Sequence, residues 1–148
     1  MIIMAKAANH PRRAARENVL KALYAEQYSD GEAPSIILNR ISDDGIDNDN
    51  KQDYISSLFN CVLEHKALVD KLIKNHLQNW EFNRIAQLDR ALLRMGICEI
   101  LYMQDIPPKV TITEMVEIAK VYSTEESSGF INGVLDAILQ DFKKDKRN

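Results

Sequence analysis

The chain has 148 residues, 45% of them hydrophobic, and a formal net charge of -3 at pH 7. A chain of this length can bury a core without disulfides or metal, so we expect one domain covering residues 1–148. The small negative charge argues against a protein that coats nucleic acid indiscriminately. The apolar opening, residues 1–4, is too short for a secretion signal or a membrane span, which predicts a cytoplasmic protein.

The cysteines and histidines do not form a ligand pattern. Cys61 and Cys98 lie in apolar stretches without CxxC spacing, which predicts buried free thiols in a reducing compartment. His10, His65 and His76 do not recur with cysteines or carboxylates at metal-ligand spacing, and we expect them at the surface or its boundary. We therefore expect no metal and no cofactor.

Scarce glycine and proline indicate helices joined by short loops. Amphipathic spacing predicts a helix over 12–28, and a short helix over 35–41 could be capped by Ser35. The acidic segment 42–50 is expected to be a loop. Apolar spacing then predicts a helical region over 51–80, in which a break near His65 is one alternative.

The stretch 84–103 is apolar on most sides, which predicts a central helix wrapped by the others. The Pro107-Pro108 pair ends this helix. Thr111 and Glu114 have the spacing of a capping box, so the next helix is expected to start there.

Ser123 and Glu126 repeat the capping-box spacing before the last helix. Gly133 in that helix is expected to allow the close approach of a neighbouring backbone. Every predicted element is a helix, so the predicted fold class is all-α.

Sequence signals for enzymatic chemistry are missing. The chain contains no glycine-rich phosphate loop and no GxSxG elbow. The acidic pairs Asp43-Asp44 and Glu125-Glu126 are typical of solvated loops and helix starts. We predict a protein that is not an enzyme and has no small-molecule substrate.

Three arginines stand at the start of the first helix: Arg12, Arg13 and Arg16. Guanidinium groups match phosphate oxygens and stack on unpaired bases, and their charge opposes the helix dipole there, which indicates a ligand. This interpretation requires that the three side chains face outward. A solvated basic turn, paired with Glu17 or with the acidic loop, is the alternative.

A second charged group, Asp89, Arg90 and Arg94, interrupts the apolar central helix. Charges in such a setting must be paired or reach the surface. One alternative is a structural ion-pair set, for example with Glu99 or Glu117. The other is an exposed edge where Asp89 and Arg90 meet another protein.

Three segments taken together resemble the NusB family: RRAARENVLKALYAEQ, LDRALLRMGICEILYMQDIPPKVTITEMVEIAKVY and STEESSGFINGVLDAI. An arginine-rich helix followed by DRALLR, DIPPKV and FINGVLD in that order is hard to assemble by chance. The resemblance implies two packed helical subdomains in one compact domain, near residues 10–80 and 84–142, with mobile ends at 1–10 and 143–148.

The resemblance also implies a function. NusB proteins pair with NusE, a small-subunit ribosomal protein, and the pair binds the boxA element of nascent RNA. We therefore expect a transcription antitermination factor that works with the RNA polymerase antitermination complex on ribosomal RNA operons. We expect no catalysis and no membrane partner.

Site residues follow from motif position within the resemblance. The expected RNA contacts are Arg12, Arg13, Arg16, Glu126 and Phe130. Tyr24 and Asp89 fall at positions tied to RNA or partner contact, and we assign them, with Arg90, to the protein partner, although tyrosine and phenylalanine are more often core residues.

Two positions depart from the family pattern. Gly129 replaces a basic residue that commonly precedes the phenylalanine, and Ala14 stands where many relatives carry another arginine. We therefore expect weaker RNA binding by the isolated chain and a greater dependence on NusE.

Two alternative functions follow from the same sequence. NusB-like domains also occur in front of RNA cytosine methyltransferases, but this chain ends at Asn148, so we expect that such an activity would need a catalytic partner in trans. The second alternative is a helical scaffold that binds only protein.

Overall fold

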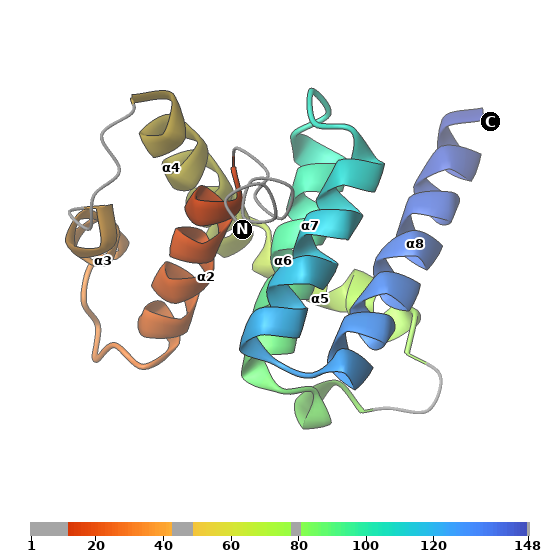
Figure 1. Cartoon of the computed structure of the whole chain (residues 1–148), viewed down its shortest axis with the longest axis horizontal. Helices are drawn as coiled ribbons and strands as arrows, with labels where there is room; N and C mark the ends of the chain where they lie inside the picture. Colours follow the sequence, from red (N-terminus) through yellow and green to blue (C-terminus); the bar gives the residue numbers. More distant parts are fainter. Residues whose placement is uncertain (1–11, 43–48, 78–80, 148) are drawn as a thin grey trace, which may run out of the picture. The chain divides into compact units, whose positions relative to one another are not determined.

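The computed structural model describes residues 12–42, 49–77 and 81–147, and all regular structure within them is helical (Figure 1). The predicted all-α class is therefore confirmed. None of these helices is both long and apolar enough to cross a membrane. The elements in chain order are α2 (Arg13–Gln27), α3 (Pro34–Ser42), α4 (Asp49–Glu64), α5 (Lys66–Asn75), the 3-10 helix η1 (Phe82–Arg84), α6 (Gln87–Tyr102), α7 (Pro108–Tyr122) and α8 (Glu125–Arg147).

Most predicted helices are present, with shifted ends. His65 separates α4 from α5, so the break there is confirmed. The central helix begins at Gln87 and not at residue 84, because η1 and an extended Ile85 precede it. Of the acidic segment, residues 43–48 lie outside the described residues, and α4 already begins at Asp49. At the carboxyl end, α8 includes residues 143–147.

Two of the predicted caps are wrong because proline starts the helix. Pro34 begins α3, so Ser35 lies inside the helix. Pro108 begins α7, and a proline at the first position has a suitable φ and no N–H to satisfy. Thr111 is therefore inside α7, where its hydroxyl donates to Glu99 Oε1 at 2.7 Å.

The third predicted cap, Ser123, is wrong by one residue. The cap of α8 is Thr124, whose Oγ1 accepts a hydrogen bond from the backbone N–H of Ser127 at 2.9 Å. Glu126 therefore does not stand at the third position of a capping box. It lies with Glu125 in the first turn of α8, where acidic side chains favour the helix dipole.

The chain divides into two compact units, Met1–Asn60 and Cys61–Asn148. The division lies within α4, whereas the expected subdomains met at 80–84. In the first unit, α2 packs against α3. The buried apolar side chains of this unit are Ala15, Val19, Leu20, Ala22, Leu23, Ile37, Leu38, Tyr54, Ile55, Leu58 and Phe59.

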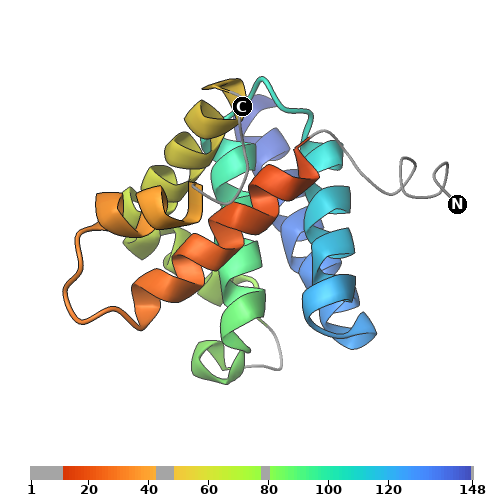
Figure 2. The same ribbon diagram turned by 60° about the vertical axis from the view of Figure 1, so that its left-hand side comes forward.

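The second unit is built around α6. Helices α6, α7 and α8 pack on one another, and α7 runs antiparallel to both α6 and α8 (Figures 1 and 2). All ten residues from 91 to 100 are buried, which confirms the predicted central helix.

Two charged side chains lie within this buried stretch, and each has a specific partner. Arg94 forms a two-point ion pair with Asp70 of α5, Nε to Oδ1 at 2.8 Å and Nη2 to Oδ2 at 3.0 Å. Glu99 accepts the hydroxyl hydrogen bond of Thr111 from α7. The two contacts tie α6 to α5 and α7.

The closely approached glycine is Gly96, and the expectation for Gly133 is wrong. A Cβ on Gly96 would lie 2.8 Å from Leu135 Cδ1, whereas a Cβ on Gly133 would meet nothing within 4 Å. The reason is that Gly96 faces the buried Leu135 of α8, while Gly133 lies on the exposed side of its own helix.

We predict opposite effects for substitutions at these glycines. Gly96→Val should lower the free energy of unfolding by roughly 1–3 kcal/mol, because the new side chain overpacks against Leu135. Gly133→Ala should raise it by up to about 1 kcal/mol, because alanine is the better helix former. Urea unfolding followed by circular dichroism measures both free energies of unfolding. An unchanged stability of Gly96→Val together with a lowered stability of Gly133→Ala would contradict the packing.

The Arg94–Asp70 pair gives a second stability prediction. The side chains are only 8% and 17% exposed, so Asp70→Ala would leave a charge buried without its partner. We expect a loss of about 3–5 kcal/mol. The control is Glu117→Ala, which removes an exposed pair with Lys120 and should cost no more than about 1 kcal/mol. Equal unfolding midpoints for the two variants would show that the buried pair is not structural.

Candidate functional site

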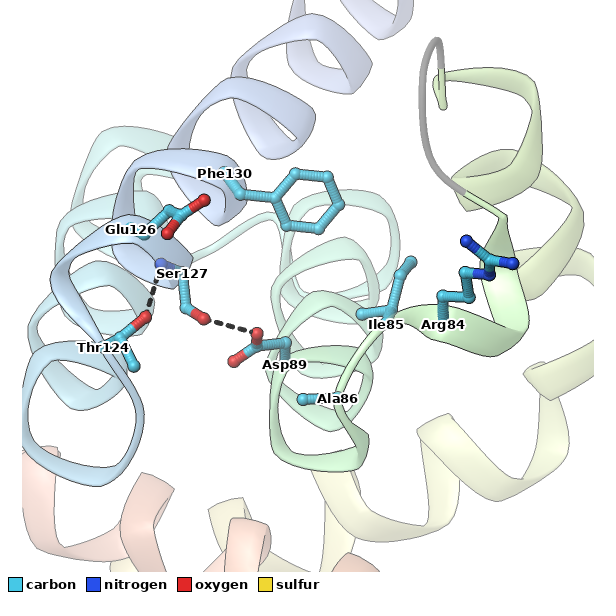
Figure 3. A pocket seen from close by; sticks show the side chains of 8 residues that line it. All are labelled: Arg84, Ile85, Ala86, Asp89, Thr124, Glu126, Ser127 and Phe130. Carbon is cyan, nitrogen blue, oxygen red and sulfur yellow. Dashed lines mark hydrogen bonds between the residues drawn. The ribbon is translucent and has the colours of Figure 1, made fainter.

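The second unit contains a pocket of about 450 Å³ between the start of α6 and the start of α8 (Figure 3). It brings together three residues that the sequence singled out, Asp89, Glu126 and Phe130. The residues that line the pocket are Arg84, Ile85, Ala86, Asp89, Thr124, Glu126, Ser127 and Phe130.

Hydrogen bonds between the two helix starts shape this pocket. The Ser127 hydroxyl donates to Asp89 Oδ2 at 2.7 Å, and the Ser127 N–H donates to Thr124 Oγ1 (Figure 3). Thr124 and Ser127 were not predicted as site residues, because a hydroxyl at a helix start looks like a cap and only the tertiary contact shows its second role.

Asp89 is 5% exposed, and one of its two carboxylate oxygens lacks a partner. Oδ2 accepts from Ser127, whereas Oδ1 is buried and has no hydrogen-bond donor in the described part of the chain. A buried polar atom without a partner is rare and calls for an explanation such as a ligand. The geometry therefore suits a donor that arrives with a binding partner.

The charge of the pocket decides which ligand groups it can accept. Asp89 and Glu126 would repel a phosphate but can accept hydrogen bonds from a base edge or from a lysine or arginine. Phe130 is partly exposed, and an aromatic ring can stack on an unpaired base. Arg84, which also lines the pocket, is an exposed cation, and its Nε lies 3.9 Å from Glu81 Oε2.

In the first unit, two of the predicted arginines converge on one aromatic ring. The guanidinium carbons of Arg12 and Arg16 lie 4.8 and 5.5 Å from the ring centre of Tyr54 in α4. Arg12 and Arg13 are partly exposed.

Arg16 is fully buried, so the expectation that all three arginines face outward is wrong for this residue. It precedes Val19 and Leu20 by three and four positions and therefore lies on the apolar stripe of α2. Stacking on Tyr54 accommodates the charge there. The spacing of Arg16 from Val19 and Leu20 was the signal in the sequence that this side chain is buried.

Tyr24 is 42% exposed on α2 and therefore is not a core residue. Its ring lies 5.0 Å from that of Tyr28, also exposed, at an angle of 48°. The side-chain hydrogen bond with Tyr28 raises the pKa of Tyr24. An exposed aromatic pair of this kind offers a surface for contact with another molecule.

Arg90 and Arg94 do not line the pocket. The Arg90 guanidinium lies 5.3 Å from the ring of Phe82. The ion-pair alternative is correct for Arg94, but its partner is Asp70 and not Glu99 or Glu117.

The cysteines are free, as predicted, with Cys98 buried and Cys61 partly exposed. The His65 ring stacks on Tyr102 with 4.0 Å between centres, and its Nδ1 lies 3.6 Å from Cys61 Sγ. Burial raises the pKa of both thiols, most strongly for Cys98. Thiols in this state are poor nucleophiles.

The histidines have ordinary structural roles where they are described. The two ring nitrogens of His76 lie within hydrogen-bonding distance of two acceptors, Nδ1 at 2.9 Å from the Leu72 carbonyl oxygen and Nε2 at 2.7 Å from Asp141 Oδ2. His10 lies outside the described residues. Within the described ranges, no three histidine, cysteine or carboxylate side chains form a group that could hold a metal ion.

Comparison with known proteins assigns the family. A sequence profile of the NusB family matches residues 13–140. The chain belongs to the NusB family. A transcription antitermination protein NusB from Salinibacter ruber is 45% identical over 132 residues, which is 88% of this chain and 81% of that protein.

Solved NusB structures share the fold of this family member. NusB of T. maritima has a TM-score of 0.79 and 36% identity, and the match covers 89% of this chain and 92% of that chain. A structure of antitermination factors NusB and NusE in complex with double-stranded RNA has a TM-score of 0.79 and 27% identity, with 88% and 96% covered.

The raised thiol pKa values predict slow alkylation of this NusB-family chain. At pH 8, iodoacetamide should modify Cys61 and Cys98 at least about tenfold more slowly in the native protein than in denaturant, since the thiolate is the reactive form. Mass spectrometry of timed samples measures the rates. Rapid native labelling of Cys98 would contradict the burial of its thiol.

Proposed function

We propose that this chain is a transcription antitermination factor that acts by binding, without catalysis. The observation that carries the proposal is the pocket, which joins Asp89, Glu126 and Phe130, positions that the family resemblance associates with RNA or partner contact. In this proposal the chain binds boxA-type RNA together with a NusE-type ribosomal protein, in the cytoplasm, as part of the RNA polymerase complex on ribosomal RNA operons.

Relatives and structural neighbours support the proposal. The Salinibacter ruber relative is named a transcription antitermination protein, and one neighbour was solved with NusE and double-stranded RNA. The same positions in a chain of the same fold are expected to serve the same partners. The methyltransferase alternative has no specific observation in its favour.

The two units supply different RNA contacts in this proposal. Arg12 and Arg13 contact phosphate groups, because their side chains are partly exposed and carry guanidinium forks. Arg16 is a positioning residue, since it is buried and stacks with Arg12 on the same Tyr54 ring.

In the pocket, Phe130 stacks on a base and Glu126 accepts hydrogen bonds from its edge. Both side chains contact the base, which is the neutral part of a nucleotide. In this proposal the pocket therefore binds bases and does not bind the phosphate backbone. Gly129 supplies no positive charge beside Phe130. The affinity of the chain for RNA is therefore expected to depend on the protein partner.

For the protein partner we propose Tyr24 and Asp89. Tyr24 offers an exposed aromatic face, and the unmatched oxygen of Asp89 can accept a hydrogen bond from a donor side chain. Arg90 is the third residue expected to contact the protein partner. Its guanidinium group lies beside the ring of Phe82 and outside the pocket.

A double arginine variant and a single lysine control test the proposal. Arg12→Ala combined with Arg13→Ala should weaken binding of a boxA oligonucleotide at least about tenfold. It should also lower the slope of log K against log salt by about 1–2, because each phosphate contact releases counterions. The control is Lys21→Ala, an exposed cation of the same helix. Fluorescence anisotropy at two salt concentrations, with and without NusE, measures binding.

The thermal midpoints of both variants should equal that of the unchanged chain. Binding that is indifferent to RNA sequence and to NusE at both salt concentrations would reject the proposal. RNA affinity unaffected by loss of both arginines, with NusE binding intact, would favour a scaffold that binds only protein.

A further inference from the structure

Three cationic side chains surround the ring of Phe82 in the second unit. Lys74 Nζ lies 4.9 Å from the ring centre, the Arg90 guanidinium carbon 5.3 Å and the Arg94 guanidinium carbon 5.8 Å. We call Lys74, Phe82, Arg90 and Arg94 the Phe82 cluster. The cluster joins α5, η1 and α6 and lies outside the pocket.

The positive charge of this cluster is only partly balanced. Asp70 neutralises Arg94 through two hydrogen bonds. Among the described side chains, those of residues 12–41, 52–77 and 81–145, no carboxylate forms an ion pair with Lys74 or Arg90. Two like charges held beside one ring repel each other, and an anion between or beside them would relieve this repulsion.

The second observation concerns Arg90 itself. Its Nε is buried and has no hydrogen-bond acceptor among the described residues. Arg94, one turn later in α6, uses Nε together with Nη2 to hold the two oxygens of Asp70. The corresponding edge of Arg90 lacks such an oxyanion, and a group with two acceptor oxygens fits it.

We infer that the Phe82 cluster binds a backbone phosphate of RNA through Arg90 and Lys74. This inference rests on the proposed function and adds to it a phosphate site in the second unit. The pocket suits a phosphate less well, because its lining residues include two carboxylates, Asp89 and Glu126, against one cation, Arg84.

The chain connects the Phe82 cluster to the pocket at two points. Phe82 belongs to the cluster and Arg84, two residues on, lines the pocket, while Arg90 of the cluster directly follows Asp89 of the pocket. An RNA strand that places a base on Phe130 would therefore have the two cations of the Phe82 cluster close to its phosphate backbone. Lys74 is exposed, and two cations without counter-ions match successive charges of a polyanion better than a single carboxylate of a protein.

The experiment measures the salt dependence of RNA binding by the full chain with NusE. Lys74→Gln combined with Arg90→Gln should lower the slope of log K against log salt by about 1–2 and weaken binding at low salt at least about tenfold. The matched control, Lys71→Gln with Lys109→Gln, also removes two positive charges from exposed positions and should leave the slope unchanged.

Two single variants keep the inference testable should the double variant not fold. Lys74→Gln changes an exposed side chain and should by itself lower the slope by about 0.7–0.9. Arg90→Lys keeps the positive charge but removes the guanidinium edge that can donate two hydrogen bonds to one phosphate. It should therefore keep the slope of log K against log salt and lower the affinity for RNA.

The outcomes separate this inference from the proposed function. If the unchanged chain with NusE does not bind the RNA, both fail. If it binds and the Phe82 cluster variants keep its slope and affinity, only the phosphate site fails. If the variants lose NusE affinity in the absence of RNA while RNA binding is unchanged, the cluster docks the protein partner, and the inference is overturned.

Discussion

The burial of α6 is the constraint on which the second unit depends. Ten consecutive residues of this helix are buried, and an unpaired charge in such a place would be far more costly than any surface contact could offset. Arg94 and Glu99 therefore need internal partners, which they find in Asp70 of α5 and Thr111 of α7. The helix held in this way presents Asp89 to the pocket at its first turn.

Charge of opposite sign is separated over short stretches of the chain. Carboxylates and an aromatic ring line the pocket, while cations surround Phe82 and stand at the start of α2. RNA has the same division, since its bases are neutral and its phosphates are anionic. In the proposed function, local cations of this kind let a protein with a net charge of -3 contact phosphate groups without a basic surface overall.

Aromatic rings are the common means of holding arginine in both units. Tyr54 accommodates Arg12 and Arg16, and Phe82 accommodates Arg90 and Arg94. Stacking keeps a guanidinium group ordered while its edge remains suited to an oxyanion. An arginine can therefore be buried in part and still belong to a binding surface, which a count of exposed charges would miss.

The sequence alone determined the all-α class, the central helix and the break at His65, because helix periodicity and breakers act over a few residues. Motif position also selected Asp89, Glu126 and Phe130, which the structure places in one pocket. Tertiary packing decided the rest. Whether Gly96 or Gly133 is closely approached, and whether Thr111 caps a helix or bonds to Glu99, depends on side chains from other helices. Those neighbours lie far away along the chain, so no local pattern encodes them.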